Sequence, residues 1–95
     1  MLVKKQLVQV YLSTPSHPTQ IARVGDNIQF LAEFNKLPDT MIWDFGDNSE
    51  PMQCKGRSCA EATKMYVNPG TYTIKLTLEF EDMQSIDTLM ELKIN

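Results

Sequence analysis

The sequence predicts an all-β domain in which two antiparallel sheets, with about seven short strands between them, pack face to face. Apolar and polar residues alternate over several short runs, which is the period of a strand with one buried face. Gly, Pro, Asn and Asp separate these runs, as turn residues do. The chain has 95 residues, enough for one such sandwich and too few for two, so residues 1–95 are expected to form a single domain.

The first half of the chain predicts three extended segments. Residues 6–12 alternate, and their apolar face is made of Val8, Val10 and Leu12. A loop with two prolines follows, in which His17 is expected to be a solvated, exposed side chain. Residues 19–24 form a short extended piece that ends in a turn. The next strand has an apolar face that is expected to meet Trp43, and this face consists of Ile28, Phe30, Ala32 and Phe34.

The second half predicts a central strand, a long irregular stretch and a terminal hairpin. Residues 41–45 form the central strand, and residues 48–60 form the longest irregular stretch. Residues 61–67 have fair helix propensity, yet the motif that follows favours a short strand ending at Tyr66. The last two strands are expected to pair antiparallel. Their inward faces are Tyr72, Ile74, Leu76, Leu78 and Phe80 on one strand, and Ile86, Thr88, Met90, Leu92 and Ile94 on the other.

The stretch Trp43-Asp44-Phe45-Gly46-Asp47 is a short strand that runs into a forced turn. Trp43 and Phe45 share one face at period two, and two large aromatics on one face require an apolar partner surface. We therefore expect Trp43 to be a core residue and not a stacking platform for a ligand. Gly46 and Asn48 tolerate positive φ, and the carboxylate of Asp47 is suited to bond N–H groups of its own turn.

A second motif, with Tyr66, Pro69, Gly70 and Tyr72, precedes the longest alternating strand. Together and in this order, the two motifs resemble the PKD (polycystic kidney disease) domain, whose core reads roughly WDFGDG followed by Y-x-x-P-G-x-Y. The resemblance covers about residues 20–94. It implies an immunoglobulin-like β-sandwich, and it implies a non-catalytic module of extracellular and cell-surface proteins. The position of Tyr72 is typical of a tyrosine corner, in which the phenol bonds backbone across a corner of the sandwich.

Two residues depart from the family pattern. Asn48 stands where the common final Gly of WDFGDG is found, and Asn also visits the left-handed region, so the turn is expected to persist. Met65 stands where a His is frequent in the family, and we expect it to contribute apolar packing instead.

Cys54 and Cys59 are the two cysteines of the chain. Their even number and short spacing suit a local disulfide, which implies an oxidising compartment, and the family resemblance favours this pairing. The alternative is a pair of free thiols in a loop. A zinc site is not expected, because no second Cys pair completes four ligands. We therefore expect an extracellular, cell-surface or periplasmic location.

Composition and charge argue against several classes of function. The formal net charge is −3, whereas a nucleic-acid binder normally shows a basic face. No apolar run approaches the roughly 20 residues of a membrane helix, so membrane insertion is not expected. A signal peptide is not visible, so an exported domain of this sequence would be a piece excised from a larger protein.

The acidic group of Asp44, Asp47 and Glu50 is the one cluster suited to chemistry. Paired carboxylates serve as acid and base in glycoside hydrolysis, but Asp47 is better explained as the acceptor of its turn. His17 is the single histidine, and no nucleophile–His pair accompanies it. We expect no enzyme activity, no catalytic residue and no cofactor. Some members of the family bind calcium, but no ligand motif in this chain allows residues to be assigned.

Two functions follow from the resemblance. The first is a spacer or protein–protein interaction module, whose partners are the neighbouring domains of the parent chain or another protein. Its candidate contact is the 48–60 stretch, through Met52, Lys55 and Arg57. The alternative is a carbohydrate-binding accessory domain of an exported hydrolase, with a polysaccharide as partner. All eight aromatic residues have an inward or corner role except Tyr11, and the scarcity of exposed aromatics favours the first function.

Overall fold

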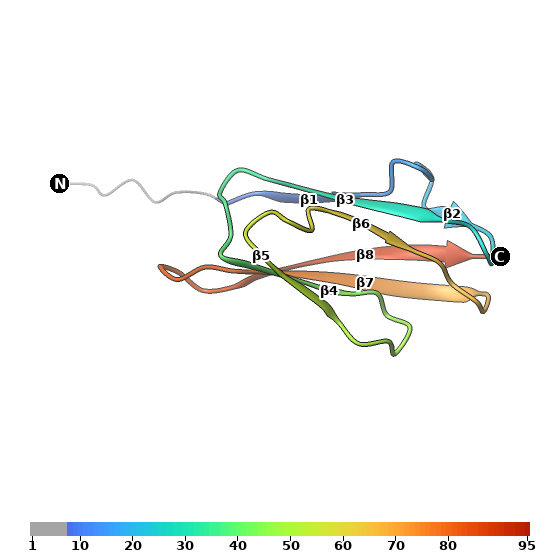
Figure 1. The fold of residues 1–95 in the computed structure, drawn as a ribbon. Helices are drawn as coiled ribbons and strands as arrows, with labels where there is room; N and C mark the ends of the chain where they lie inside the picture. The colour runs from blue at the N-terminus through green and yellow to red at the C-terminus, as the bar shows by residue number, and fades with distance from the viewer. Residues whose placement is uncertain (1–7) are drawn as a thin grey trace.

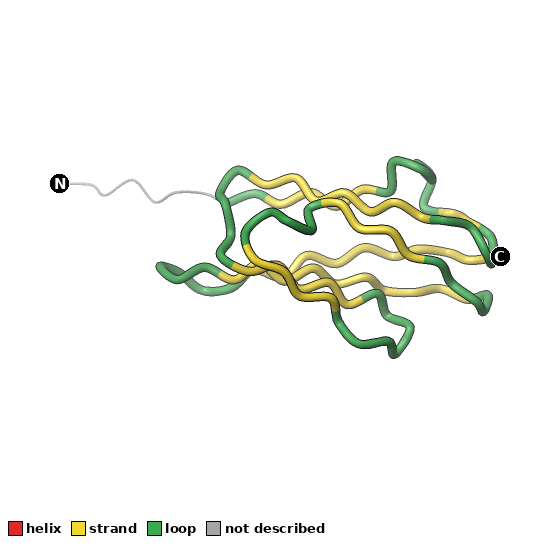
Figure 2. The backbone as a smooth tube through the Cα atoms, in the orientation of Figure 1, coloured by secondary structure: helices red, strands yellow, loops and turns green. Residues whose placement is uncertain are grey.

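Two β-sheets pack face to face in the computed structural model of the protein, which describes residues 8–95. One sheet lies above the other in Figure 1, and Figure 2 shows most of the connecting loops at the two ends of the sandwich and one loop projecting below the lower sheet. Within the described part of the chain, no helix is long and apolar enough to cross a membrane. The strands are β1 (Val10–Ser13), β2 (Ile21–Ala22), β3 (Ile28–Phe34), β4 (Thr40–Asp44), β5 (Met52–Lys55), β6 (Glu61–Lys64), β7 (Gly70–Glu79) and β8 (Ile86–Ile94).

The smaller sheet has the order β1-β3-β6 and is antiparallel throughout. Val10 of β1 lies opposite Phe34 of β3, and Phe30 of β3 lies opposite Ala62 of β6. The apolar residues of all three strands therefore fall on one face at period two, as the alternation of β3 predicted. On the opposite face, Gln29, Glu33 and Glu61 are exposed to solvent.

The larger sheet has the order β2-β8-β7-β4-β5. The β7–β8 hairpin pairs from Gly70↔Ile94 to Leu78↔Ile86, so the predicted antiparallel hairpin is confirmed. β2 pairs parallel to β8, an exception to the antiparallel arrangement that the sequence predicted. The loop after β1 moves the chain across to the other sheet without reversing its direction, so β2 runs alongside β8 toward the same end.

The core lies between the sheets and is built on Trp43, which is fully buried. Its ring stacks on Phe45, with ring centroids 5.9 Å apart, and meets the ring of Phe30 from the other sheet at 6.0 Å. The expected meeting of the β3 face with Trp43 is therefore present. Burial of these rings and of the other core side chains is the main driving force that holds the two sheets together.

Some boundaries differ from those predicted. The 48–60 stretch is not irregular throughout, because β5 lies within it and pairs with β4, with Met52 opposite Trp43. A four-residue edge strand is too short to show a clear period. β6 ends at Lys64 and not at Tyr66, because the chain leaves the sheet while the Tyr66 side chain turns into the core. Residues 6 and 7 of the predicted first strand lie outside the described residues, and Val8, Val10 and Leu12 pack against the core.

Two side chains occupy environments other than those expected. His17 is not a solvated side chain: only 19% of it is exposed, its Nδ1 lies 2.8 Å from the hydroxyl of Ser16, and its Nε2 lies 3.1 Å from the Asp26 carboxylate. These hydrogen bonds, which lie within the segment between β1 and β3, hold the imidazole ring against the protein. Met65 is 48% exposed, so its expected packing is wrong; the neighbouring Tyr66 takes the inward position instead.

Candidate functional site

The turn after β4 is built from hydrogen bonds that its own carboxylates accept. The Asp44 carboxylate accepts the N–H of Gly46 at 3.0 Å, and the Asp47 carboxylate accepts the N–H of Ser49 at 3.2 Å. Gly46 has φ +75°, and a Cβ at this position would collide with the backbone carbonyl of Thr73 on β7. Asn48 adopts φ +64°, so Asn keeps the left-handed turn in place of the family's Gly.

The Asp47 carboxylate is also held by a lysine. It forms an ion pair of 2.9 Å with Lys64, whose ammonium lies over the ring of Phe45 at 5.5 Å from the centroid. Partial burial works to raise the pKa of Asp47, but hydrogen bonds from Ser49 and Lys64 outweigh it and hold the pKa at about 2. This carboxylate is therefore ionised and fully engaged in the turn, which leaves it poorly suited to acid–base catalysis.

The two tyrosines of the second motif brace the same end of the sandwich. The buried phenol of Tyr66 donates to the carbonyl of Phe45 at 2.7 Å, and burial raises the pKa of this phenol. Tyr72 donates to the carbonyl of Asn68, four residues upstream, also at 2.7 Å. The rings lie 4.3 Å apart. Pro69 and Gly70 turn the chain between them, so these motif residues are occupied in architecture.

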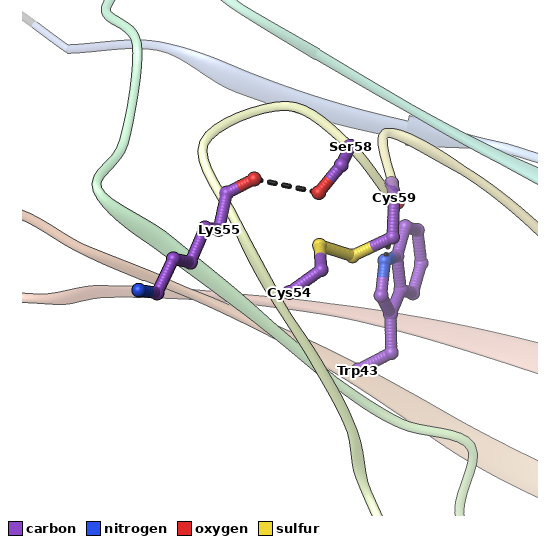
Figure 3. The surroundings of a disulfide bond; sticks show 5 residues. All are labelled: Trp43, Cys54, Lys55, Ser58 and Cys59. Atoms are coloured by element: carbon purple, nitrogen blue, oxygen red, sulfur yellow. Dashed lines mark hydrogen bonds between the residues drawn. A yellow bond between two sulfur atoms is a disulfide. The ribbon is translucent and has the colours of Figure 1, made fainter.

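Cys54 and Cys59 form a disulfide, as predicted (Figure 3). Cys54 lies on β5, and Cys59 is buried in the core just before β6. The indole N–H of Trp43 donates to the backbone carbonyl of Cys59 at 2.8 Å, which satisfies the polar atom of the central buried residue. The disulfide therefore fixes a loop that is also anchored to the middle of the core.

The three candidate contact residues lie in different environments. The Lys55 side chain is exposed and points away from the disulfide in Figure 3. Arg57 is exposed as well, but its guanidinium lies over the ring of Phe34, 5.8 Å from the centroid. Met52 is half-buried and packs against the core opposite Trp43. The loop thus displays two cations, whereas the methionine faces inward.

Asp39 is a residue whose role the sequence did not reveal. Its backbone carbonyl accepts the N–H of Gly56 in the disulfide loop at 2.9 Å, and its carboxylate accepts the N–H of Glu81 at 2.6 Å. It therefore ties together the β3–β4, β5–β6 and β7–β8 connections. The dipeptide Pro38-Asp39 signals a turn, but the sequence holds no sign of which distant amides this turn meets.

The acidic residues do not gather into a metal site. Among residues 8–95, no group of three His, Cys, Asp or Glu side chains lies close enough to hold a metal ion. A hollow of about 380 Å³ beside the Asp47 turn is lined by Asp47 and Lys64, which neutralise each other, and by exposed Met65 and Val67. Its charged groups are thus already paired with each other.

The model of one family, the PKD domain, matches residues 14–89. This chain belongs to the PKD domain family. The match includes both motifs and all strands from β2 to β7. The family assignment and the two-sheet architecture agree, so the PKD-like β-sandwich expected from the sequence is confirmed. No curated protein matches the chain.

Solved structures add a likeness in fold. One of them is described as concerning the promiscuous specificity of carbohydrate-binding modules from the β-sandwich superfamily, and it aligns with this PKD domain at a TM-score of 0.74 and 20% sequence identity. The alignment covers 98% of this chain and 36% of that chain, so the PKD domain corresponds to about a third of the neighbour. The likeness therefore shows a shared sandwich fold.

Proposed function

We propose that this PKD domain is a non-catalytic module of a secreted or cell-envelope protein, in which it acts as a spacer or as a protein-interaction unit. Family membership supports a module without catalytic activity. The disulfide supports an oxidising compartment, such as the cell exterior or the periplasm. On this proposal, residues 1–95 are one domain of a larger exported protein.

The arrangement of the strands supports the spacer role. β1 begins at the end of the sandwich where β3 finishes, since Val10 lies opposite Phe34. β8 finishes at the other end, where Ile94 lies opposite Gly70 (Figure 1). Segments attached before β1 and after β8 would therefore be held apart by the length of a rigid sandwich.

The interaction role is supported above all by the way in which the disulfide loop is held in place. It is held by the Cys54–Cys59 bond, by Trp43 at the Cys59 carbonyl and by Asp39 at Gly56. A loop fixed in this way loses little conformational entropy when a partner binds, and that cost otherwise reduces affinity. The loop presents Lys55 and Arg57 on a chain of net charge −3, so an acidic protein surface is the partner that it suits.

The test is Lys55→Glu together with Arg57→Glu in the parent protein, with assembly measured by light scattering after size-exclusion chromatography. Charge reversal should weaken the complex, and the loss should be larger at low salt. Because Arg57 also lies over the Phe34 ring, its replacement changes packing as well as any contact with the partner. Lys55→Glu alone therefore tests the partner contact without that change in packing. Lys75→Glu, on the outer face of β7, is the matched control. If assembly with every partner is unchanged, the loop has only a structural role and the proposed protein contact is wrong.

A second candidate function is that of a carbohydrate-binding accessory domain of an exported hydrolase. Tyr11 favours it, because this aromatic ring is 64% exposed on a rigid strand and has no part in the core. The fold shared with a carbohydrate-binding module is compatible with this role. Retardation of the domain by soluble polysaccharides in native gels would support this candidate.

A further inference from the structure

We propose that the outer face of the three-stranded sheet is a binding site for a neutral glycan chain, with Tyr11, Leu31 and Glu61 as its main contacts. This proposal rests on the second candidate function and assigns a place to it. Lys55 does not line this site, whereas Arg57 of the disulfide loop does, so Lys55→Glu is the substitution that distinguishes the loop from the site.

Two hollows lie side by side along β3 and β6. The first, of about 420 Å³, is lined by Pro15, Gln29, Leu31, Glu61 and Thr63 among others. The second, of about 380 Å³, also includes Leu31 and Glu61 and extends to Glu33 and Arg57. The shared residues show that the hollows adjoin and form one groove. From residue 29 to residue 33 the groove follows β3 for about 13 Å at the usual rise per residue, which is room for a short run of sugar rings.

The polar groups of the groove are free to bind hydroxyls. Glu33 and Glu61 are exposed, and among residues 8–95 neither carboxylate has a hydrogen-bond or ion-pair partner. An ionised carboxylate accepts hydrogen bonds at both oxygens, which suits adjacent hydroxyl groups of a sugar. The amide of Gln29 and the guanidinium of Arg57 add donors at the two ends. Leu31 supplies an apolar floor between them.

Tyr11 borders the groove on the side of β1. Val10 and Leu12 pack against the core, so the alternation of β1 turns Tyr11 to the outer face. Its partner across the strands is Glu33, which lines the second hollow. An aromatic ring offers an apolar face to the C–H groups of a sugar ring while its hydroxyl remains available for hydrogen bonds. The groove thus combines an exposed ring with neighbouring carboxylates.

The charge of the groove selects among glycans. Two carboxylates and one guanidinium leave it with a net negative charge, so an acidic polysaccharide would be repelled. The outer face of the larger sheet fits a glycan less well. Its most exposed large apolar side chain is the aliphatic Leu89, at 63%, and the described part of that face presents no exposed aromatic ring.

The test measures retardation of the intact domain in native gels that contain a soluble neutral polysaccharide: hydroxyethyl cellulose, xylan or galactomannan. Polygalacturonate serves as the acidic counterpart. At least one neutral polysaccharide should retard the domain, and Tyr11→Ala should weaken the apparent affinity about tenfold. Glu61→Gln should also weaken it, because the amide loses the charge that strengthens its hydrogen bonds.

Leu89→Ala is the matched control, because it removes an equally exposed apolar side chain from the opposite outer face, and its affinity should equal that of the wild type. Neutral-glycan binding that survives both Tyr11→Ala and Glu61→Gln would overturn this site while leaving a carbohydrate-binding function. Retardation by none of the polysaccharides would overturn the site and the second candidate function together. Retardation by polygalacturonate alone would overturn the assignment to neutral glycans. Circular dichroism of each variant establishes that these exposed substitutions leave the fold intact.

Discussion

Individual residues at the Asp47 turn each take part in more than one structural interaction. Asp47 accepts a backbone N–H and pairs with Lys64, while Lys64 also lies over Phe45. Gly46 supplies a positive φ and at the same time allows the backbone of β7 to approach. Experiments can measure separately the cost of a positive φ at Gly46 and the cost of crowding the β7 backbone there. The contribution of the Asp47 charge to stability can be measured as well.

The ionisation of Asp47 should make stability depend on pH in the acid range. Its pKa is about 2 in the folded protein and 3.8 as the reference value, so its contribution is complete above about pH 4 and is lost as pH falls toward 2. Asp47→Asn should therefore lower the free energy of unfolding at pH 6 and flatten its fall between pH 4 and pH 2. Urea unfolding at a series of pH values measures both effects.

Lys64→Met is the companion variant for that experiment, because it removes the partner and leaves the carboxylate in place. It should flatten the same pH profile in part, since the hydrogen bonds from Ser49 remain. Asp26 and Asp82 also have lowered pKa values and will preserve some slope in every variant. A profile for Asp47→Asn that is parallel to that of the wild type would show that this pair has no such role.

Gly46→Ala should destabilise the domain more than Gly25→Ala does. Both glycines have positive φ, +75° and +88°, so each alanine costs about 1–2 kcal/mol of conformational strain. A Cβ on Gly25 meets open space, whereas a Cβ on Gly46 collides with the Thr73 backbone. We expect Gly46→Ala to lose about 1–3 kcal/mol more in denaturant unfolding. Equal losses would mean that the β7 backbone moves away without cost.

At the scale of elements, the disulfide and the hydrogen bond from Trp43 to Cys59 together fix the crossing between the two sheets. β5 is the edge of the larger sheet and β6 is the edge of the smaller one, and the loop between them passes from one to the other. Cys54 belongs to β5, while Cys59 precedes β6 and holds the Trp43 indole through its carbonyl. The bond therefore restrains the loop that crosses from the edge of one sheet to the edge of the other.

Removal of the disulfide should weaken this crossing without abolishing the fold. Cys54→Ser with Cys59→Ala should lower the free energy of unfolding by about 2 kcal/mol, the amount expected for closing so short a loop. Trp43 fluorescence should shift because the Cys59 carbonyl is no longer fixed. Protein from its native compartment should have an intact mass two hydrogens below the reduced value. Two titratable thiols without reductant would argue against the bond and against export.

At the scale of the whole molecule, the sandwich separates its surfaces by role. The core and both motif regions are occupied in holding the sheets together, through Trp43, Tyr66 and the Asp47–Lys64 pair. The disulfide loop lies at the end of the sandwich where β3 finishes, and the groove lies on the outer face of the smaller sheet. Protein contact and glycan binding are thus assigned to adjoining surfaces that share Arg57, and Lys55→Glu and Tyr11→Ala distinguish them.

The sequence by itself determined the architecture, because the information lies in local patterns. The alternation in β3, β7 and β8 specifies which side chains are buried, and a one-residue slip in β7 would expose the apolar set ending at Phe80. The turn residues Gly46 and Asn48 specify their backbone conformation through their own chemistry. The short spacing of Cys54 and Cys59 made their bond predictable for the same reason.

Only the tertiary structure decided which distant groups meet. Asp39 binds amides that are far away in sequence, His17 is held by Asp26, and β2 lies parallel to β8. The groove likewise forms from β3, β6 and Pro15 in the loop that follows β1, which no local period brings together. Such contacts depend on how the sheets stack and where the connections cross, and these are properties of the packed chain as a whole.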